Sequence, residues 1–281
     1  MIKKNFLFIC LIGLVAFVVN VTPTFAMARN FTNYYGVEMT DEEYSTLLNL
    51  GFSEDEIYYM TEKIFNENKD ASAELLAKTV KYYKTVYPTY GTSYTVEVTE
   101  EEFNAHKDDG LRGTVTTAYK TIISTVSANG SRYRFKVTET WTNLPSVHSY
   151  DVIGIGYTGN IHIQVGPTFY YTYTTSNGNV TTSYSYFNML TDTYGGTATF
   201  HLPSAFVGMS STMYYDVDKD AGAGTITSLY MCGDYAHATQ TVTGAQAASH
   251  SIDIGGITFS PSVANKFDAT PCAYTNLSVN W

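Results

Sequence analysis

Residues 133–141 read Tyr-Arg-Phe-Lys-Val-Thr-Glu-Thr-Trp, and this stretch decides the fold class of the second half of the chain. Apolar side chains at 133, 135, 137 and 141 alternate with polar ones, which is the period of a strand with one face in a core and the other in water. Glu139 alone interrupts the apolar face. The stretch therefore predicts a sheet with one buried face and one wet face.

Further along the chain, turn signals separate many similar stretches. Asn177-Gly178 predicts a hairpin with a two-residue type I′ turn, because that turn needs positive φ at both central positions. Such a loop pairs three sets of residues across the strands: Thr175 with Val180, Tyr171 with Tyr184, and Phe169 with Tyr186. Four more turns are expected at Asn129-Gly130, Gly195-Gly196, Ala221-Gly222 and Gly255-Gly256. Residues 113–281 are thus predicted to form a mainly antiparallel β-sandwich or jelly roll.

The segment 29–88 has a helical pattern instead. Thr40 with Glu43, and Ser53 with Glu56, have the spacing of capping boxes, which start helices. Asp70 is expected to cap a third helix, whose apolar residues recur at helical spacing until Pro88 ends it: Leu76, Val80, Tyr83 and Tyr87. We predict a small three-helix unit here, and hence an α+β chain.

A bridging segment, residues 89–112, joins the two parts. Tyr94, Val96 and Val98 alternate as a short strand, and a third capping box starts at Thr99. The bridge is therefore predicted to hold one short strand and one short helix.

The first 28 residues have the composition of a secretory signal peptide. Lys3 and Lys4 precede an apolar run from Phe6 to Val19, and Ala26-Met27-Ala28 supplies the small residues that signal peptidase accepts. The run is shorter than a membrane-spanning helix requires. Because neither a lipoprotein motif, a wall-sorting motif nor a second long apolar stretch follows, we expect a secreted protein without a stable membrane anchor.

Charge and cysteine content limit the partners. The chain has 16 basic and 26 acidic residues, a net charge of −10, and its cations are not clustered. Nucleic acid is therefore an unfavourable partner. Beyond the leader the cysteines are Cys232 and Cys272, which in an exported protein are compatible with one disulfide or with two buried thiols.

Catalytic and metal motifs are weakly represented. The chain lacks G-x-S-x-G and H-E-x-x-H, and Asp234 and His237 would face opposite sides of a strand, so we assign no catalytic residue. Asp216, Asp218 and Asp220 have the spacing that opens a calcium loop. However, Ala221 and Thr227 stand where that loop needs glycine and glutamate, so an acidic hairpin tip is preferred and no metal or cofactor is predicted.

Several short motifs carry a resemblance to a known group of proteins. They are Tyr34-Tyr35-Gly36, Asp41-Glu42-Glu43-Tyr44, the run from Leu47 to Phe52, Tyr82-Tyr83-Lys84-Thr85, and the run from Cys232 to Ala238. Together they resemble uncharacterised secreted proteins of low-GC Gram-positive bacteria, over most of the mature chain. The resemblance implies export and architecture, and it transfers no catalytic residue.

The β region has an unusual surface composition. Neither lysine nor arginine occurs between Lys136 and Lys219, so hydroxyl and aromatic residues must fill many positions there. Tyrosine offers a large flat contact area with a polar tip, suited to sugars or protein surfaces. Four tyrosines on the expected hairpin are candidate binding residues: Tyr171, Tyr173, Tyr184 and Tyr186. We predict a non-enzymatic extracellular protein that binds glycan, cell wall or protein surfaces, with a secreted hydrolase and a pore-forming protein as alternatives.

Overall fold

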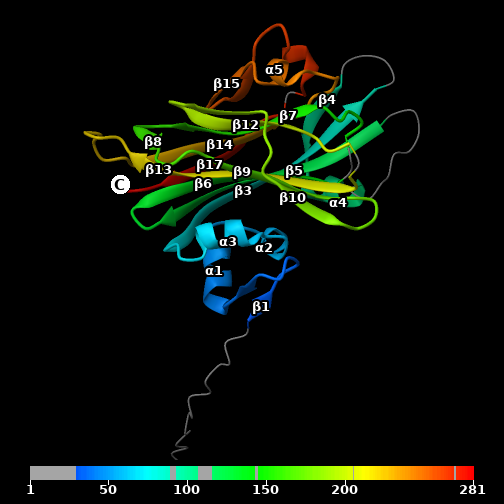
Figure 1. Ribbon diagram of the computed structural model, residues 1–281. Helices are drawn as coiled ribbons and strands as arrows, with labels where there is room; N and C mark the ends of the chain where they lie inside the picture. Colours follow the sequence, from blue (N-terminus) through cyan, green and yellow to red (C-terminus); the bar gives the residue numbers. More distant parts are fainter. Residues whose placement is uncertain (1–29, 89–92, 107–115, 143–144, 205, 269) are drawn as a thin grey trace, which may run out of the picture.

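The computed structural model describes residues 30–88, 93–106, 116–142, 145–204, 206–268 and 270–281. The predicted signal peptide lies outside the described residues. In the described part, two antiparallel sheets lie face to face, with short helices on their outer sides (Figure 1). The chain is therefore an α+β protein in which strands dominate.

The larger sheet has eight strands in the order β10-β9-β13-β6-β5-β3-β4, with β8 paired to β13. Its strands are β3 (Ala73–Tyr87), β4 (Tyr94–Val98), β5 (Thr116–Asn129), β6 (Arg132–Trp141), β8 (Ile161–Ile163), β9 (Thr168–Thr174), β10 (Val180–Ser183) and β13 (Gly208–Lys219). The strand predicted at 133–141 is therefore β6, in the middle of this sheet. The predicted short strand of the bridge is β4, and the helix that follows it is α4 (Glu100–His106).

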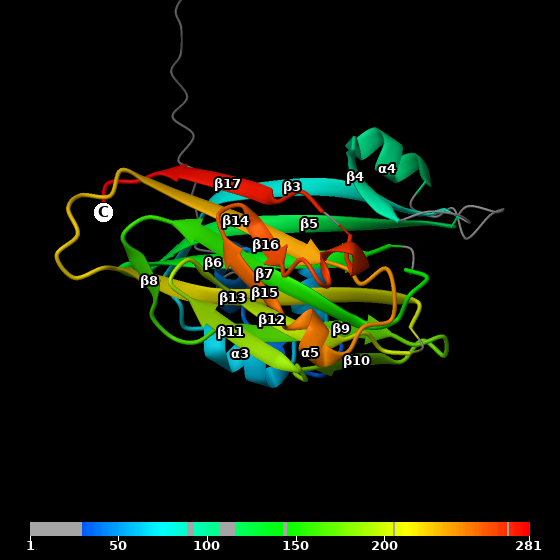
Figure 2. The same ribbon diagram turned by 90° about the horizontal axis from the view of Figure 1, so that it is seen from above.

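The smaller sheet has five strands in the order β11-β12-β7-β14-β17. They are β7 (Tyr150–Thr158), β11 (Asn188–Asp192), β12 (Gly195–His201), β14 (Ser228–Ala236) and β17 (Ala273–Ser278). A hairpin of β15 (His250–Asp253) and β16 (Gly256–Phe259), together with α5 (Gly244–Ala247), lies on its outer side (Figure 2). A 3-10 turn at Ala264–Lys266 precedes β17. Gly156 permits the hairpin to lie this close, since a Cβ there would come 1.8 Å from the carbonyl oxygen of Asp253.

The main core lies between the two sheets. It contains inward-facing side chains of both, among them Phe135, Val137, Ile153, Ile155, Met213, Tyr215, Met231 and Tyr235. The apolar half of the alternation in 133–141 thus faces the second sheet, as the period of two requires.

The opposite face of the larger sheet is covered by the N-terminal segment. This segment holds β1 (Phe31–Thr32), β2 (Glu38–Met39), α1 (Asp41–Asn49), α2 (Glu54–Tyr58) and α3 (Glu62–Asn68), and Figure 1 shows these helices beneath the sheet. Both predicted capping boxes are present: Thr40 Oγ1 accepts from the Glu43 N–H at 3.2 Å, and Ser53 Oγ accepts from the Glu56 N–H at 3.2 Å. Gly51, with φ of 85°, follows the end of α1.

The predicted third helix up to Tyr87 is wrong. Residues 73–87 form strand β3, which pairs with both β5 and β4, and the third helix is α3, which ends at Asn68, before the predicted cap Asp70. The apparent helical spacing combined residues from two faces, because Tyr83 and Tyr87 lie in the inter-sheet core whereas Val80 faces the other way. Pairing on both sides favours the β-branched and aromatic residues of this stretch.

The expectation of a wet face on β6 is also wrong. Arg134, Lys136 and Thr138 are 7%, 1% and 4% exposed, because the N-terminal segment covers them. Alternation in sequence shows that the two faces differ, but it does not show what packs against the polar one.

The hairpin at Asn177-Gly178 exists with a different register. Val180 pairs with Thr174 and Ser183 with Tyr171, so the loop has five residues, 175–179, and Gly178 has φ of 79°. A shift of one residue moves each side chain to the opposite face. The predicted pairs Tyr171 with Tyr184 and Phe169 with Tyr186 are therefore wrong. Gly195 and Gly196 likewise lie inside β12, not in a turn.

Candidate functional site

A groove of about 510 Å³ lies between helix α2 and the outer face of the larger sheet. Its floor consists largely of hydroxyl side chains from β5, β6, β9 and β13: Thr121, Thr138, Thr140, Thr172, Thr174, Ser210 and Thr212. Its wall includes Ser53, Asp55, Glu56 and Tyr59 of the N-terminal segment. The groove therefore combines residues that are far apart in the sequence.

The hydroxyls form cross-strand rows because of the sheet register. Ser210 lies between Thr140 and Thr172, and Thr212 lies opposite Thr138. Thr140 Oγ1 and Ser210 Oγ are 3.2 Å apart, within hydrogen-bond distance. Threonine suits a strand sterically, and each hydroxyl can both donate and accept. The floor thus offers many neutral hydrogen-bonding groups.

A buried ion pair fixes α2 over this floor. Lys136 Nζ lies 2.8 Å from Glu56 Oε1, and it donates to the Gly51 carbonyl at 3.0 Å and to Thr138 Oγ1 at 2.8 Å. Burial alone raises the pKa of Glu56, but the charge and hydrogen bond of Lys136 outweigh burial and lower that pKa. Glu56 is therefore ionised at neutral pH and is neutralised by its partner.

Four tyrosines gather beside α2. Tyr34, Tyr35, Tyr58 and Tyr59 form a chain of ring contacts, with centroids 5.1 Å apart for Tyr34 and Tyr35, 5.4 Å for Tyr34 and Tyr59, and 4.8 Å for Tyr58 and Tyr59. Tyr34, Tyr35 and Tyr58 are 44%, 39% and 42% exposed. We call these four residues the tyrosine cluster.

The tyrosine cluster borders the groove at two points. Tyr59 is itself a lining residue. At the other side, the Tyr35 hydroxyl lies 3.3 Å from Thr182 Oγ1, which is 3.0 Å from Thr172 Oγ1 on the floor. Aromatic surface and hydroxyl floor are therefore continuous.

The four tyrosines predicted from the hairpin do not share a face. Tyr171 is buried in the inter-sheet core, and Tyr173 packs partly buried against it. Tyr184 lies on the opposite side, hydrogen-bonded to the Thr61 hydroxyl, and Tyr186 is 52% exposed. Tyr171 pairs with Ser183 and not with Tyr184 as predicted, so Tyr184 lies on the opposite face of the sheet from Tyr171. The tyrosine cluster was missed, although the doublets Tyr34-Tyr35 and Tyr58-Tyr59 are visible in the sequence.

The three aspartates considered for calcium each face a basic side chain. Asp216 accepts from Arg134 Nε at 2.6 Å, Asp218 from Arg132 Nε at 3.0 Å, and Asp220 lies 2.9 Å from His162 Nδ1. Within the described ranges, no cluster of three or more His, Cys, Asp or Glu residues could hold a metal ion.

Asp234 and His237 have separate partners inside the molecule. His237 Nδ1 lies 2.9 Å from Asp151 Oδ2, whereas Asp234 accepts from the backbone N–H of Ile257 and of Tyr235, each at 2.7 Å. Burial outweighs these bonds and raises the pKa of Asp234 to about 6. Both residues are buried, so neither is accessible to a macromolecular substrate.

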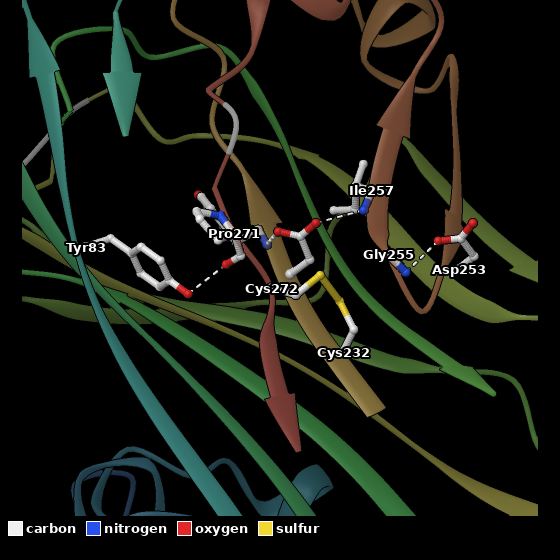
Figure 3. The surroundings of a disulfide bond; sticks show 9 residues. Tyr83, Cys232, Asp253, Gly255, Ile257, Pro271 and Cys272 are labelled. Carbon is white, nitrogen blue, oxygen red and sulfur yellow. Dashed lines mark hydrogen bonds between the residues drawn. A yellow bond between two sulfur atoms is a disulfide. The ribbon is translucent and has the colours of Figure 1, made fainter. Parts of the chain in front are cut away.

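Cys232 and Cys272 form a disulfide between β14 and the residue preceding β17 (Figure 3). Beside it, the Tyr83 hydroxyl of β3 donates to the Pro271 carbonyl at 2.7 Å. The C-terminal segment is thus tied to both sheets.

Comparison with known proteins identifies neither a family nor a close relative. No protein-family model and no curated protein matches the chain. Among solved structures, it is similar to the collagen binding domain of Erysipelothrix rhusiopathiae surface protein RspB, with 10% identity, a TM-score of 0.30, and coverage of 74% of this chain and 80% of that domain. AvmM, which catalyses macrocyclization in alchivemycin A biosynthesis, matches with 12% identity, a TM-score of 0.22, and coverage of 54% and 82%. Neither likeness assigns an activity or a ligand to this chain.

None of the helices in the described part of the chain is long and apolar enough to cross a bilayer.

Proposed function

We propose that the protein is an extracellular binding module whose groove holds a neutral polysaccharide. The observation that carries this proposal is the continuity between the hydroxyl floor and the exposed tyrosine cluster. Sugars present alternating hydroxyl edges and apolar C–H faces, so they need a surface with both hydrogen-bonding groups and flat aromatic rings. The N-terminal helices form one wall of this site, as a unit docked on the sandwich.

The charge of the groove favours a neutral ligand. Among the lining residues that the structure describes, the charged side chains are Asp55 and Glu56, and Glu56 is already paired with Lys136. An anionic polymer would meet the exposed Asp55 carboxylate without a compensating cation. The signal-peptide pattern of residues 1–28 supports a location outside the cell, where wall and host glycans are the available polymers.

The test is retention of the purified protein on insoluble neutral glycans and on cell-wall preparations. We expect saturable retention that is strongly reduced in the double variant Tyr58→Ser/Tyr59→Ser. Tyr230→Ser is the matched control, because Tyr230 is 43% exposed, close to the 42% of Tyr58, but belongs to the smaller sheet.

Four outcomes would contradict the proposal. Equal loss in the control would mean that the tyrosine cluster is not the site. Release of soluble sugars would favour a hydrolase, and dye leakage from liposomes would favour a pore-forming protein. Retention only on immobilised protein would replace the glycan with a protein ligand.

A further inference from the structure

A second buried lysine and carboxylate meet in the core between the sheets. Lys120 Nζ, on β5, lies 2.7 Å from Oδ2 of Asp268, and both side chains have no exposed surface. The two residues are 148 positions apart in the chain. Burying a charged pair so completely is costly. Burial alone would raise the pKa of Asp268, but the charges and hydrogen bonds of Lys120 and His237 outweigh burial and lower that pKa, so the resting pair is ionic.

Neighbouring aromatic rings and hydrogen-bond donors hold both side chains in place. Lys120 Nζ lies 5.0 Å from the ring centroid of Trp141 and 5.1 Å from that of Tyr235. Asp268 Oδ1 accepts the backbone N–H of His237 at 2.6 Å, and Oδ2 accepts the Thr95 hydroxyl at 2.8 Å. The carboxyl group therefore has one oxygen held by an N–H donor and the other beside the amine.

A third buried acid stands next to this pair. In the β5–β6 register Lys120 lies opposite Trp141 and Ile122 opposite Glu139, so Glu139 is the diagonal inward neighbour of Lys120. Glu139 is fully buried; its Oε2 accepts from Ser211, and its Oε1 has no hydrogen-bond partner among the residues that the structure describes. Burial raises the pKa of Glu139 well above its ordinary value, which favours the protonated form of this carboxyl group.

We propose that Lys120 and Asp268 condense to an intramolecular amide, with Glu139 carrying the proton that the reaction moves. A proton first passes from the Lys120 ammonium to the Asp268 carboxylate. The Nζ lone pair then attacks Cγ and forms the N–C bond, while the His237 N–H holds the negative charge that develops on Oδ1. Glu139 gives its proton to Oδ2, the C–Oδ2 bond breaks, and Oδ2 leaves as water. Glu139 regains a proton from the nitrogen, so the net change is ammonium plus carboxylate to amide plus water.

The buried lysine–carboxylate pair on the outer face of the sheet provides an internal control. Lys136 and Glu56 lie at a similar distance, 2.8 Å, but Glu56 remains 8% exposed. It also accepts hydrogen bonds from the Ser53 N–H and the Thr138 and Thr212 hydroxyls, which hold it in its ionised form. Hydrogen bonding does not distinguish the two pairs, because both oxygens of Asp268 are occupied as well. The pairs differ in the neighbouring acid. On β13 the diagonal neighbours of Lys136 are Thr212 and Asp216, and Asp216 is already paired with Arg134, whereas Glu139 beside Lys120 has one oxygen without a hydrogen-bond partner among the residues that the structure describes. We expect no amide there.

The test is mass spectrometry of the purified protein after reduction of its disulfide. The wild type should be lighter than its sequence by one water molecule. After trypsin, cleavage at Lys120 should be absent, and residues 113–132 should be joined to residues 267–281 in one branched peptide. Lys120→Arg, Asp268→Ala and Glu139→Gln should each have the full mass, whereas Lys136→Arg should remain lighter by one water.

Glu139→Gln is the decisive variant, because it preserves the shape of the side chain and both reacting groups. A wild type of full mass, with residues 113–120 and 267–281 found as separate peptides, would overturn the proposal. Loss of water that maps to any other pair of residues would overturn it as well. An amide that forms fully in Glu139→Gln would overturn the role given to Glu139. Because masses are read on denatured protein, a poorly folded Lys120→Arg variant does not prevent the measurement.

Discussion

Two buried lysine–carboxylate pairs lie on opposite faces of the same sheet, and their surroundings differ. On the outer face, Lys136 and Glu56 are joined by hydrogen bonds to the chain around them and lie at the edge of a groove. On the inner face, Lys120 lies over the rings of Trp141 and Tyr235, and a buried acid with a raised pKa, Glu139, is its diagonal neighbour. The distances between nitrogen and oxygen in the two pairs are similar, 2.7 Å and 2.8 Å, so distance alone does not distinguish the pairs. Both carboxylates are fully hydrogen-bonded, so the proposed amide depends on the buried acid next to Lys120 and not on the hydrogen bonding of the pair itself.

The largest effect is expected from breaking the outer pair. Lys136→Met leaves the Glu56 carboxylate buried without its partner, so the free energy of unfolding should fall by about 3–5 kcal/mol. Equilibrium unfolding in urea measures this change. The double variant Lys136→Met/Glu56→Leu should recover most of the loss, because it removes the unpaired charge. A single variant as stable as the wild type would show that the pair does not fix α2 to the sheet.

Loss of the disulfide should have the next-largest effect on stability. Cys232 and Cys272 are 40 residues apart, and on the chain-entropy model the double variant Cys232→Ser/Cys272→Ser should lose about 4 kcal/mol of stability. Native-state reduction of the wild type should give a similar decrease. If neither treatment shifts the urea midpoint, the C-terminal segment is held by its other contacts alone.

Asp234 and Glu56 should make opposite contributions to the pH dependence of stability. Asp234 has a pKa of about 6 in the folded protein, above its ordinary value of 3.8, so the folded state binds more protons between these values. Stability should therefore decrease by about 2 kcal/mol as the pH rises from 4 to 6, and Asp234→Asn should abolish this component. Urea unfolding at several pH values, with wild type and variant compared at each, isolates it.

Glu56 provides the opposite case. Its pKa is lowered in the folded protein, so its contribution to stability is present above the ordinary pKa of a glutamate and is lost as the pH falls below it. The stability difference between wild type and Lys136→Met/Glu56→Leu should therefore shrink at acid pH. A difference that grows there would contradict the direction of the Glu56 shift.

The smallest effect on stability is expected at the proposed binding surface. Tyr58 is 42% exposed, so Tyr58→Ser should change the free energy of unfolding by no more than about 0.5 kcal/mol. It should nevertheless weaken retention on neutral glycans. Thermal unfolding measured beside glycan retention separates the two effects, and a large loss of stability would mean that the tyrosine cluster is structural.

The capping boxes and the alternation in 133–141 were reliable signals, whereas the Asp70 cap and the turn at Gly195-Gly196 were not. The capping boxes at Thr40 and Ser53 and the strand at 133–141 depend on nearby residues, and the structure contains all three. The helix expected before Pro88 is a strand because β4 and β5 pair with it, and no local pattern reports those partners. The hairpin register differs by one residue because the loop is longer than the turn signal implied.

The candidate sites depend on packing between distant segments. The groove needs α2 above four strands, and the pair Lys120 and Asp268 brings together residues 148 positions apart. Composition did indicate a surface rich in hydroxyl groups and tyrosine. It could not indicate that Tyr171 points into the core while Tyr34 and Tyr58 remain exposed.

One contact of Tyr35 has a consequence for self-association. Its hydroxyl lies 3.4 Å from the Val180 carbonyl oxygen and 3.3 Å from Thr182 Oγ1, both on β10, which is the edge strand of the larger sheet. An open edge presents unpaired backbone groups to which a strand of another molecule can add. The ring of Tyr35 occupies part of that edge, and β10 has only four residues. The N-terminal segment therefore also protects the sheet against edge-to-edge aggregation.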